Sequence, residues 1–318
     1  MRHGTVSRAT AAKIRKIRDR IEEADIPPSK LDENLILGTW NVRELGKKRR
    51  GKDAIHLIAE IVSQFDLLAL TELRDDLRDL GRVMEILGDY WRVVYSDYRT
   101  DGAGNRERMA FIYDKRMVTF TGLAAEADEP RTKVGGVYTP SFAWWRSPYM
   151  ASFRAGNFDF VVLAAHMRWG NSVTERAAAI EKLADWVEDR RTDKNKAADK
   201  DFIVLGDFNI PSKRSKAFKA LVKHGLIVPN GLVNVKGTNL SEKNTYDQIA
   251  HSASNPDRFT NRGGVIRFYK SSYKELYPDL SKSKFTFQLS DHLPLWIEVD
   301  TWIEDEQLDQ ILNRPRRR

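Results

Sequence analysis

The chain has 318 residues, 41% of them hydrophobic, which is enough to bury the core of one large domain or of two smaller ones. No apolar run approaches the roughly 20 residues that cross a bilayer, so a membrane span is excluded. The lack of cysteine excludes disulfides, thiolate nucleophiles and cysteine-based zinc sites, while a net charge of +8 favours a polyanionic partner.

Residues 1–33 are expected to form a basic helical extension. Ile14, Ile17 and Ile21 recur at helical spacing among lysines and arginines, and the helix should stop before the prolines at 27 and 28. A helix packed on the flank of the main domain is a simpler interpretation than a nucleic-acid-binding arm. No continuous apolar stretch follows the first positive charges, so no secretory signal is expected and a cytoplasmic location is predicted.

The main domain is expected to span residues 34–300, where short apolar runs alternate with helical patterns. The predicted strands are Leu35–Trp40, Leu67–Thr71, Arg92–Tyr95, Met109–Tyr113, Tyr149–Phe153, Phe158–Ala165, Phe202–Leu205, Thr245–Ala250, Val265–Tyr269 and Leu293–Val299. The predicted helices are Asp53–Gln64, Leu77–Leu87, Val173–Asp189 and Ser215–His224. Many strands beside few helices predict an α/β (α+β) fold, a four-layered sandwich of two mixed β-sheets flanked by helices. Residues 301–318 are expected to form an acidic-then-basic tail ending in a disordered NRPRRR.

Several predicted strands end in residues that carry carboxylate, amide or imidazole groups. The run Phe202–Leu205 leads into GDFN, where extended backbone would place Asp207 and Asn209 on one side and Phe208 on the other. Other strands lie next to Asn41, Glu72, His166 and the pair Asp291–His292. Taken singly, such a residue is more often a cap or a satisfied turn residue than a catalyst. Together they predict an oxygen-rich site of the kind that Mg²⁺ prefers, with imidazoles beside it, which suits phosphodiester cleavage.

The order of these motifs resembles that of the endonuclease/exonuclease/phosphatase superfamily. The matching segments are TWNVREL, LLALTELRDD, ERMAFIYD, AAHMRWG, LGDFNIPS, NTYDQIA and SDHLPLWIEV, between about residue 35 and residue 299. Within that superfamily the chain looks most like the deoxyribonuclease I branch. The resemblance implies a deoxyribonuclease I-like fold and a metal-dependent nuclease, most simply a DNA endonuclease that leaves 5′-phosphate and 3′-hydroxyl ends.

The resemblance also implies a set of metal ligands. Asn41, Glu72 and Asp291 would gather around the principal Mg²⁺, for which Mn²⁺ could substitute. Asp207 and Asn209 would lie on its other side or at a second cation. Asp207 would orient or deprotonate the attacking water, and Asn209 would hold that water or a phosphate oxygen.

Two imidazole–carboxylate pairs follow from the same resemblance. His292 would donate to a phosphate oxygen and be held by Asp247, while His166, supported by Glu107, would lie opposite. A carboxylate partner stabilises the cationic imidazole and raises its pKa toward the range where it can donate a proton. Arg146 matches an arginine-x-proline element of the branch, and a guanidinium there could grip phosphate bidentately, although a salt-bridged arginine is nearly as good an interpretation.

Two residues depart from the pattern of the branch. Thr71 stands where glutamine usually precedes the metal-binding glutamate. This difference is expected to affect the support of Glu72 more than the catalytic step. Asn105 stands where a tyrosine usually contacts the minor groove. The resemblance therefore defines the mode of binding to duplex DNA less closely than it defines the reaction.

The basic segment GKKRRGKD, Gly46–Asp53, allows two interpretations. It departs from the phosphate-binding P-loop motif at one position, where Asp53 replaces the Ser or Thr that would bind Mg²⁺. Contact with a phosphodiester backbone is therefore the preferred role for Lys47, Lys48, Arg49 and Arg50.

Other functions remain open from the sequence alone. The superfamily includes phosphatases and phospholipid phosphodiesterases, and their substrates are also anionic. A ribonuclease is a further alternative, because phosphate contacts do not distinguish sugars unless a group reads the 2′-hydroxyl, so DNA is only favoured over RNA. A non-catalytic nucleic-acid-binding module would not need the full set of polar residues. The pair Trp144–Trp145 could stack on bases, but packing between loops is the commoner use of such residues.

Overall fold

A computed structural model of the chain describes residues 1–98, 103–170, 172–194, 200–269 and 272–302, together with residues 308, 311 and 312. The NRPRRR end, predicted to be disordered, lies outside the described residues. Within the described ranges, no helix is both long and apolar enough to cross a membrane.

Two mixed sheets contain most of the strands. One is six-stranded in the order β12-β13-β1-β2-β4-β3, and the other is five-stranded in the order β11-β10-β9-β8-β5. Their strands are β1 (Asn34–Leu45), β2 (Leu67–Leu73), β3 (Trp91–Tyr95), β4 (Arg108–Asp114), β5 (Thr119–Glu126), β8 (Tyr149–Ala155), β9 (Phe158–His166), β10 (Phe202–Asp207), β11 (Asp247–His251), β12 (Phe259–Val265) and β13 (Leu295–Asp300). The parallel pairs are β1 with β2 and β9 with β10. A separate hairpin is made by β6 (Arg131–Val134) and β7 (Val137–Pro140).

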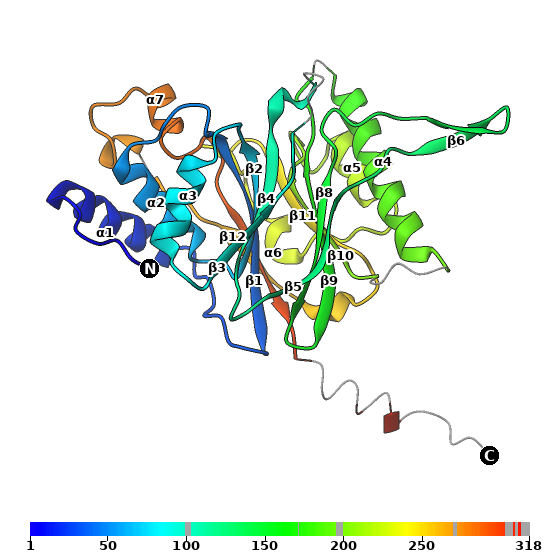
Figure 1. Cartoon of the computed structure of the whole chain (residues 1–318), viewed down its shortest axis with the longest axis horizontal. Helices are drawn as coiled ribbons and strands as arrows, with labels where there is room; N and C mark the ends of the chain where they lie inside the picture. The colour runs from blue at the N-terminus through cyan, green and yellow to red at the C-terminus, as the bar shows by residue number, and fades with distance from the viewer. Residues whose placement is uncertain are drawn as a thin grey trace.

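The two sheets pack face to face and bury the core between them (Figure 1). Phe111 of β4 meets Phe153 of β8 edge-on, with ring centroids 5.7 Å apart. The central strands β1, β2, β9 and β10 are buried almost throughout. This burial on both faces explains why they read as nearly continuous apolar runs rather than as alternating ones.

Helices form the two outer layers (Figure 1). On the six-stranded side lie α1 (Arg8–Glu22), α2 (Lys52–Val62) and α3 (Arg78–Leu87), and on the five-stranded side lie α4 (Val173–Thr192) and α5 (Lys216–Val222). Two further short helices are α6 (Asn230–Val233) and α7 (Lys282–Thr286). The predicted four-layered α/β sandwich is confirmed.

The predicted N-terminal helix is α1, and it packs against α2. Ile14, Ile17 and Ile21 are buried. Arg18 donates hydrogen bonds of 2.6 and 2.9 Å to the carboxylate of Glu60, which is itself buried on α2. Flank packing is therefore confirmed for this helix.

Four strands differ from the sequence-based expectation. The strand expected at Val265–Tyr269 lies earlier, at Phe259–Val265, because β12 is an edge strand that pairs with β13 through its backbone and has no apolar alternation. The pattern that suggested the later position reflects Ile266 and Phe268, which are buried by tertiary packing. Strand β5 and the β6–β7 hairpin were not predicted, because they are largely exposed and bury no apolar face.

One end of the sandwich collects the polar residues singled out in the sequence. The parallel pairs β1–β2 and β9–β10 bring their carboxyl ends to this end. The antiparallel strands β4, β11 and β13 begin there. Residues from distant parts of the chain therefore meet at the junction of the two sheets.

Candidate active site

Unusual backbone conformations direct the side chains at these strand ends. Gly206 has φ +132°, and a Cβ there would lie 2.0 Å from the carbonyl oxygen of Ala165, so only glycine fits. Glu72 and Asn209 adopt left-handed φ angles of 63° and 52°. Such conformations are uncommon outside glycine and concentrate at functional sites.

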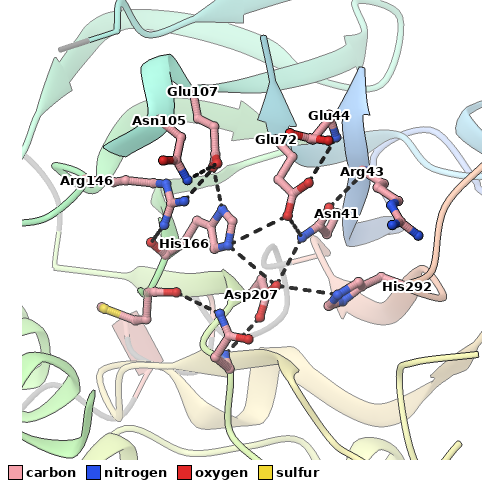
Figure 2. Close-up of polar contacts among 12 residues, drawn as sticks. Asn41, Arg43, Glu44, Glu72, Asn105, Glu107, Arg146, His166, Asp207 and His292 are labelled. Atoms are coloured by element: carbon pink, nitrogen blue, oxygen red, sulfur yellow. Dashed lines mark hydrogen bonds and ion pairs between the residues drawn. The ribbon is translucent and has the colours of Figure 1, made fainter. Parts of the chain in front are cut away.

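Asp207, the last residue of β10, lies at the centre of the site (Figure 2). Its Oδ2 accepts a hydrogen bond of 3.0 Å from Nδ2 of Asn41, and its Oδ1 accepts one of 2.8 Å from the backbone N–H of Asn209. The Nε2 atoms of His166 and His292 each lie 3.7 Å from Oδ2. One buried carboxylate thus faces an imidazole from each sheet.

His166, at the end of β9, is held by Glu107, the residue just before β4 (Figure 2). Its Nδ1 lies 2.8 Å from Oε2 of Glu107. Arg146 donates a 2.8 Å hydrogen bond to the other oxygen of Glu107 and one of 3.4 Å to the carbonyl of His166. The expected His166–Glu107 pair is present, and Arg146 supports it from within the cleft wall.

His292, just before β13, forms the second pair with Asp247. Its Nδ1 lies 2.8 Å from Oδ2 of Asp247, the first residue of β11. Its backbone is fixed as well, because its N–H donates to Ser290 and its carbonyl accepts a 3.0 Å hydrogen bond from the indole of Trp40. The ring therefore presents Nε2 to the cleft.

Electrostatics favour the charged form of both imidazoles. Burial works against a charged His292, but the carboxylates of Asp247 and Asp207 outweigh it and raise its pKa well above the usual range. Burial and Arg146 oppose a charged His166, yet Glu107 and Asp207 raise its pKa as well. Burial would raise the pKa of Glu107, but His166 and Arg146 together lower it to about 2.

Acidic and imidazole groups in the site could hold a divalent cation. Ligand atoms of Glu72, His166 and Asp207 lie within 4.8 Å of one another, and the same is true of Asp207, Asp247 and His292. Glu72 and Asp207 supply carboxylate oxygens that suit a hard cation. The residues present therefore fit a metal site centred between Glu72 and Asp207.

Asn41 and Asp291 make other contacts in this structure. Asn41 directs its amide nitrogen to Glu72 at 2.8 Å, while its oxygen accepts a 2.9 Å hydrogen bond from the N–H of Arg43. The oxygen of Asn41 would reach a cation only if the amide turned over. Asp291 lines the same cleft, with its Oδ2 3.2 Å from Nη1 of Arg43.

The site opens into a polar cleft with a volume of about 670 Å³. The guanidinium-bearing residues in its lining are Arg43, Arg146 and Arg168, and the aromatic ones are Trp145, Trp169 and Tyr246. Cations and aromatic rings thus surround the acidic centre, an arrangement that admits an anionic substrate with a flat group attached.

The basic loop after β1 separates into two parts. Lys47, Lys48 and Arg49 are exposed. Arg50 is only 3% exposed and donates to the carbonyls of Val42 and Arg43, so the expected phosphate contact is corrected for Arg50. The backbone N–H groups of Arg50 and Gly51 donate to Asp79 and Gln288, so they do not form the phosphate cradle of a P-loop.

Three residues that line or support the cleft were not identified in the sequence. Arg43 binds Asp291, and Arg176 of α4 donates to the carbonyl of Asn209 at 2.6 Å. Trp169 lines the cleft three residues after His166. Only Trp169 gave a signal, as a tryptophan in the loop that follows β9, whereas an arginine on a helix resembles any solvated one.

Solved structures with this architecture come from several organisms. An endonuclease/exonuclease/phosphatase family protein from Bacteroides thetaiotaomicron is 19% identical, with a TM-score of 0.55 over 84% of this chain and 97% of the other. A mannosyl-6-phosphatase from the same organism is 18% identical, with a TM-score of 0.53 over 83% and 99%. The human Nocturnin catalytic domain is 15% identical, with a TM-score of 0.51 over 86% and 96%. At these identities the similarity shows the fold.

Sequence comparison supplies the family. A search of curated protein sequences finds no significant match. The family model for the Endonuclease/Exonuclease/phosphatase family matches residues 38–292, which include every residue that lines the cleft. The chain therefore belongs to the endonuclease/exonuclease/phosphatase family.

Proposed function

We propose that the protein is a metal-dependent nuclease that hydrolyses phosphodiester bonds in DNA. The observation that carries this proposal is the placement of His166 and His292 on either side of Asp207, each at 3.7 Å and each held by its own carboxylate. A phosphodiester has oxygens on opposite sides of phosphorus that must be stabilised at once. Two opposed imidazoles suit that requirement.

We assign roles in the proposed hydrolysis to Asp207, Asn209, His292 and His166. Asp207 orients the attacking water and accepts its proton, and the N–H of Asn209 holds the carboxylate in place. His292 donates from Nε2 to a non-bridging phosphate oxygen, while His166 donates a proton to the departing 3′ oxygen. The water oxygen joins phosphorus, the bond between phosphorus and the 3′ oxygen breaks, and the products carry a 5′-phosphate and a 3′-hydroxyl.

The proposed cofactor is Mg²⁺, with Mn²⁺ as a substitute. Glu72 and Asp207 would hold it, joined by Asp291 and by Asn41 after rotation of its amide. When bound, the cation supplies positive charge that stabilises the phosphate as negative charge develops.

Positive charge around the cleft supports a nucleic-acid substrate. Arg43 and Arg168 line the cleft. Three exposed cations, Lys47, Lys48 and Arg49, lie in the loop that follows β1. Such cations neutralise neighbouring phosphates of a polymer, which a small phosphate ester does not have. A phosphatase is the second candidate, favoured by the structural similarity to a mannosyl-6-phosphatase.

Plasmid cleavage separates these candidates. Supercoiled plasmid, single-stranded DNA, RNA and inositol phosphates are incubated with protein in Mg²⁺ or in EDTA. Nicked plasmid whose new ends are extended by a polymerase without prior phosphatase treatment supports the nuclease. Release of inorganic phosphate alone would establish the phosphatase. His292→Ala should abolish cleavage, while His224→Gln, which alters a surface pair with Asp185, is the matched control.

A further inference from the structure

Trp169 is a large apolar side chain left open in a polar cleft. Its side chain is 55% exposed, although it lies beside Asn209 and Tyr246 in the catalytic lining. A tryptophan offers about 150–250 Å² for burial, so this position leaves a substantial apolar area in contact with water. Core packing therefore does not account for it.

The loop that carries Trp169 is nevertheless firmly held. Arg176 of α4, only 6% exposed, donates to the carbonyls of Arg168, Trp169 and Asn209. Its guanidinium also lies 4.9 Å from the Trp169 ring centroid. One buried cation thus joins the Trp169 loop to the catalytic strand end at Asn209, and the open indole has a defined position.

Tyr246 connects this indole to the reacting centre. Its ring packs at nearly a right angle to Trp169, with centroids 5.2 Å apart, and its centroid lies 5.9 Å from that of His292. A phosphate at His292 would therefore have an aromatic surface about one nucleotide away. Nearby, Arg168 lies over the Trp145 ring at 4.0 Å, which places a cation in the same cleft.

We propose that Trp169 is a stacking platform for the base of a nucleotide next to the scissile phosphate, and that the enzyme therefore acts preferentially on unpaired nucleic acid. This inference rests on the proposed nuclease function. A base inside a duplex is covered on both faces by its neighbours, so it can stack on Trp169 only in a single strand, a gap or a frayed end. Stacking of this kind tolerates every base, because each base has a flat face. The cleft would thus select strandedness rather than sequence.

The test compares strands with and without a base. Wild-type protein, Trp169→Ala and Trp169→Phe are assayed for cleavage in Mg²⁺ on a single-stranded oligothymidylate, on the same strand carrying one abasic analogue at each possible position, and on its duplex. Binding of the strands in EDTA is measured by fluorescence anisotropy. Trp302→Ala is the matched control, because Trp302 is 47% exposed but lines a different cavity beside Pro27 and Asp300.

The expected results are specific to the base. Wild-type protein should prefer the single strand over the duplex, and Trp169→Ala should weaken single-strand binding about tenfold, with a smaller loss in Trp169→Phe. An abasic residue at one particular position should reduce wild-type binding to the level of Trp169→Ala and should leave that variant unaffected. Equal losses on all strands, no loss in Trp169→Ala, or a wild-type preference for duplex would each overturn the stacking role while leaving the nuclease intact. Wild-type protein that cuts no nucleic acid would overturn both.

Discussion

The guanidinium of Arg176 donates a 2.6 Å hydrogen bond to the carbonyl oxygen of Asn209, so a helix on the outer layer fixes a residue of the catalytic strand end. Burial lowers the pKa of Arg176, because removing the charged guanidinium from water is unfavourable.

Arg176→Met should lower kcat at least tenfold, because Asn209 and Asp207 lose their support. It should also weaken single-strand binding, because the carbonyls of Arg168 and Trp169 lose the same guanidinium. Arg176→Lys should recover part of the loss. A double-mutant cycle with Asn209→Ala on kcat checks the positioning role, since the two losses should not add. Fully additive losses would show that Arg176 acts independently of Asn209.

Glu107→Gln should reduce kcat about 10²- to 10⁴-fold, since proton transfer in a transition state contributes an effect of that size. The amide cannot stabilise a cationic His166 as the carboxylate does. In a His166→Ala background the same substitution should cost much less. The measurement is kcat on a defined oligonucleotide, and a large further loss in that background would assign Glu107 a role of its own.

Lys48→Ala and Arg49→Ala should each weaken DNA binding and reduce the salt slope of log K by about 0.9, as expected for one lost phosphate contact. Both residues are exposed in the loop that follows β1. Arg50→Ala should instead destabilise the fold, because Arg50 is buried on backbone carbonyls. Binding titrations at several salt concentrations and thermal unfolding distinguish the two effects, and an unchanged slope would exclude the loop from the interface.

His251 should make the fold sensitive to acid. Burial lowers its pKa to about 4, while the unfolded chain keeps an ordinary histidine pKa. The unfolded state therefore binds the proton first, and stability that is present above pH 6.5 is lost as pH falls toward 4, by about 3 kcal/mol in total. His251→Phe should flatten this part of the pH profile of the free energy of unfolding. An unaltered profile in His251→Phe would refute the assignment.

The elements that bury apolar surface were predictable, and those that do not were missed. Strands such as Phe158–His166 and Phe202–Asp207 carry long apolar runs because both of their faces are covered. The β6–β7 hairpin exposes all of its strand residues, so no burial pattern marks it. The Gly135–Gly136 turn was its only signal, with both residues at positive φ.

Motif order placed the central residues of the site more reliably than their neighbours. Asp207, His166 and His292 come together as expected because each stands at a strand end on the same side of the sandwich. Arg50 was misassigned because composition alone does not distinguish a buried cation from its exposed neighbours. Arg176 was missed because its hydrogen bond to Asn209 is a tertiary contact that no local pattern encodes.

The central claim is that the groups around Asp207 direct a water molecule at a phosphodiester bond. The most direct measurement is cleavage of an oligonucleotide in water enriched in oxygen-18, followed by mass spectrometry of the products. The account predicts that the label enters the new 5′-phosphate with wild-type protein, and that Asp207→Asn forms almost no labelled product. Label found at a 3′ end, or only in released inorganic phosphate, would contradict it.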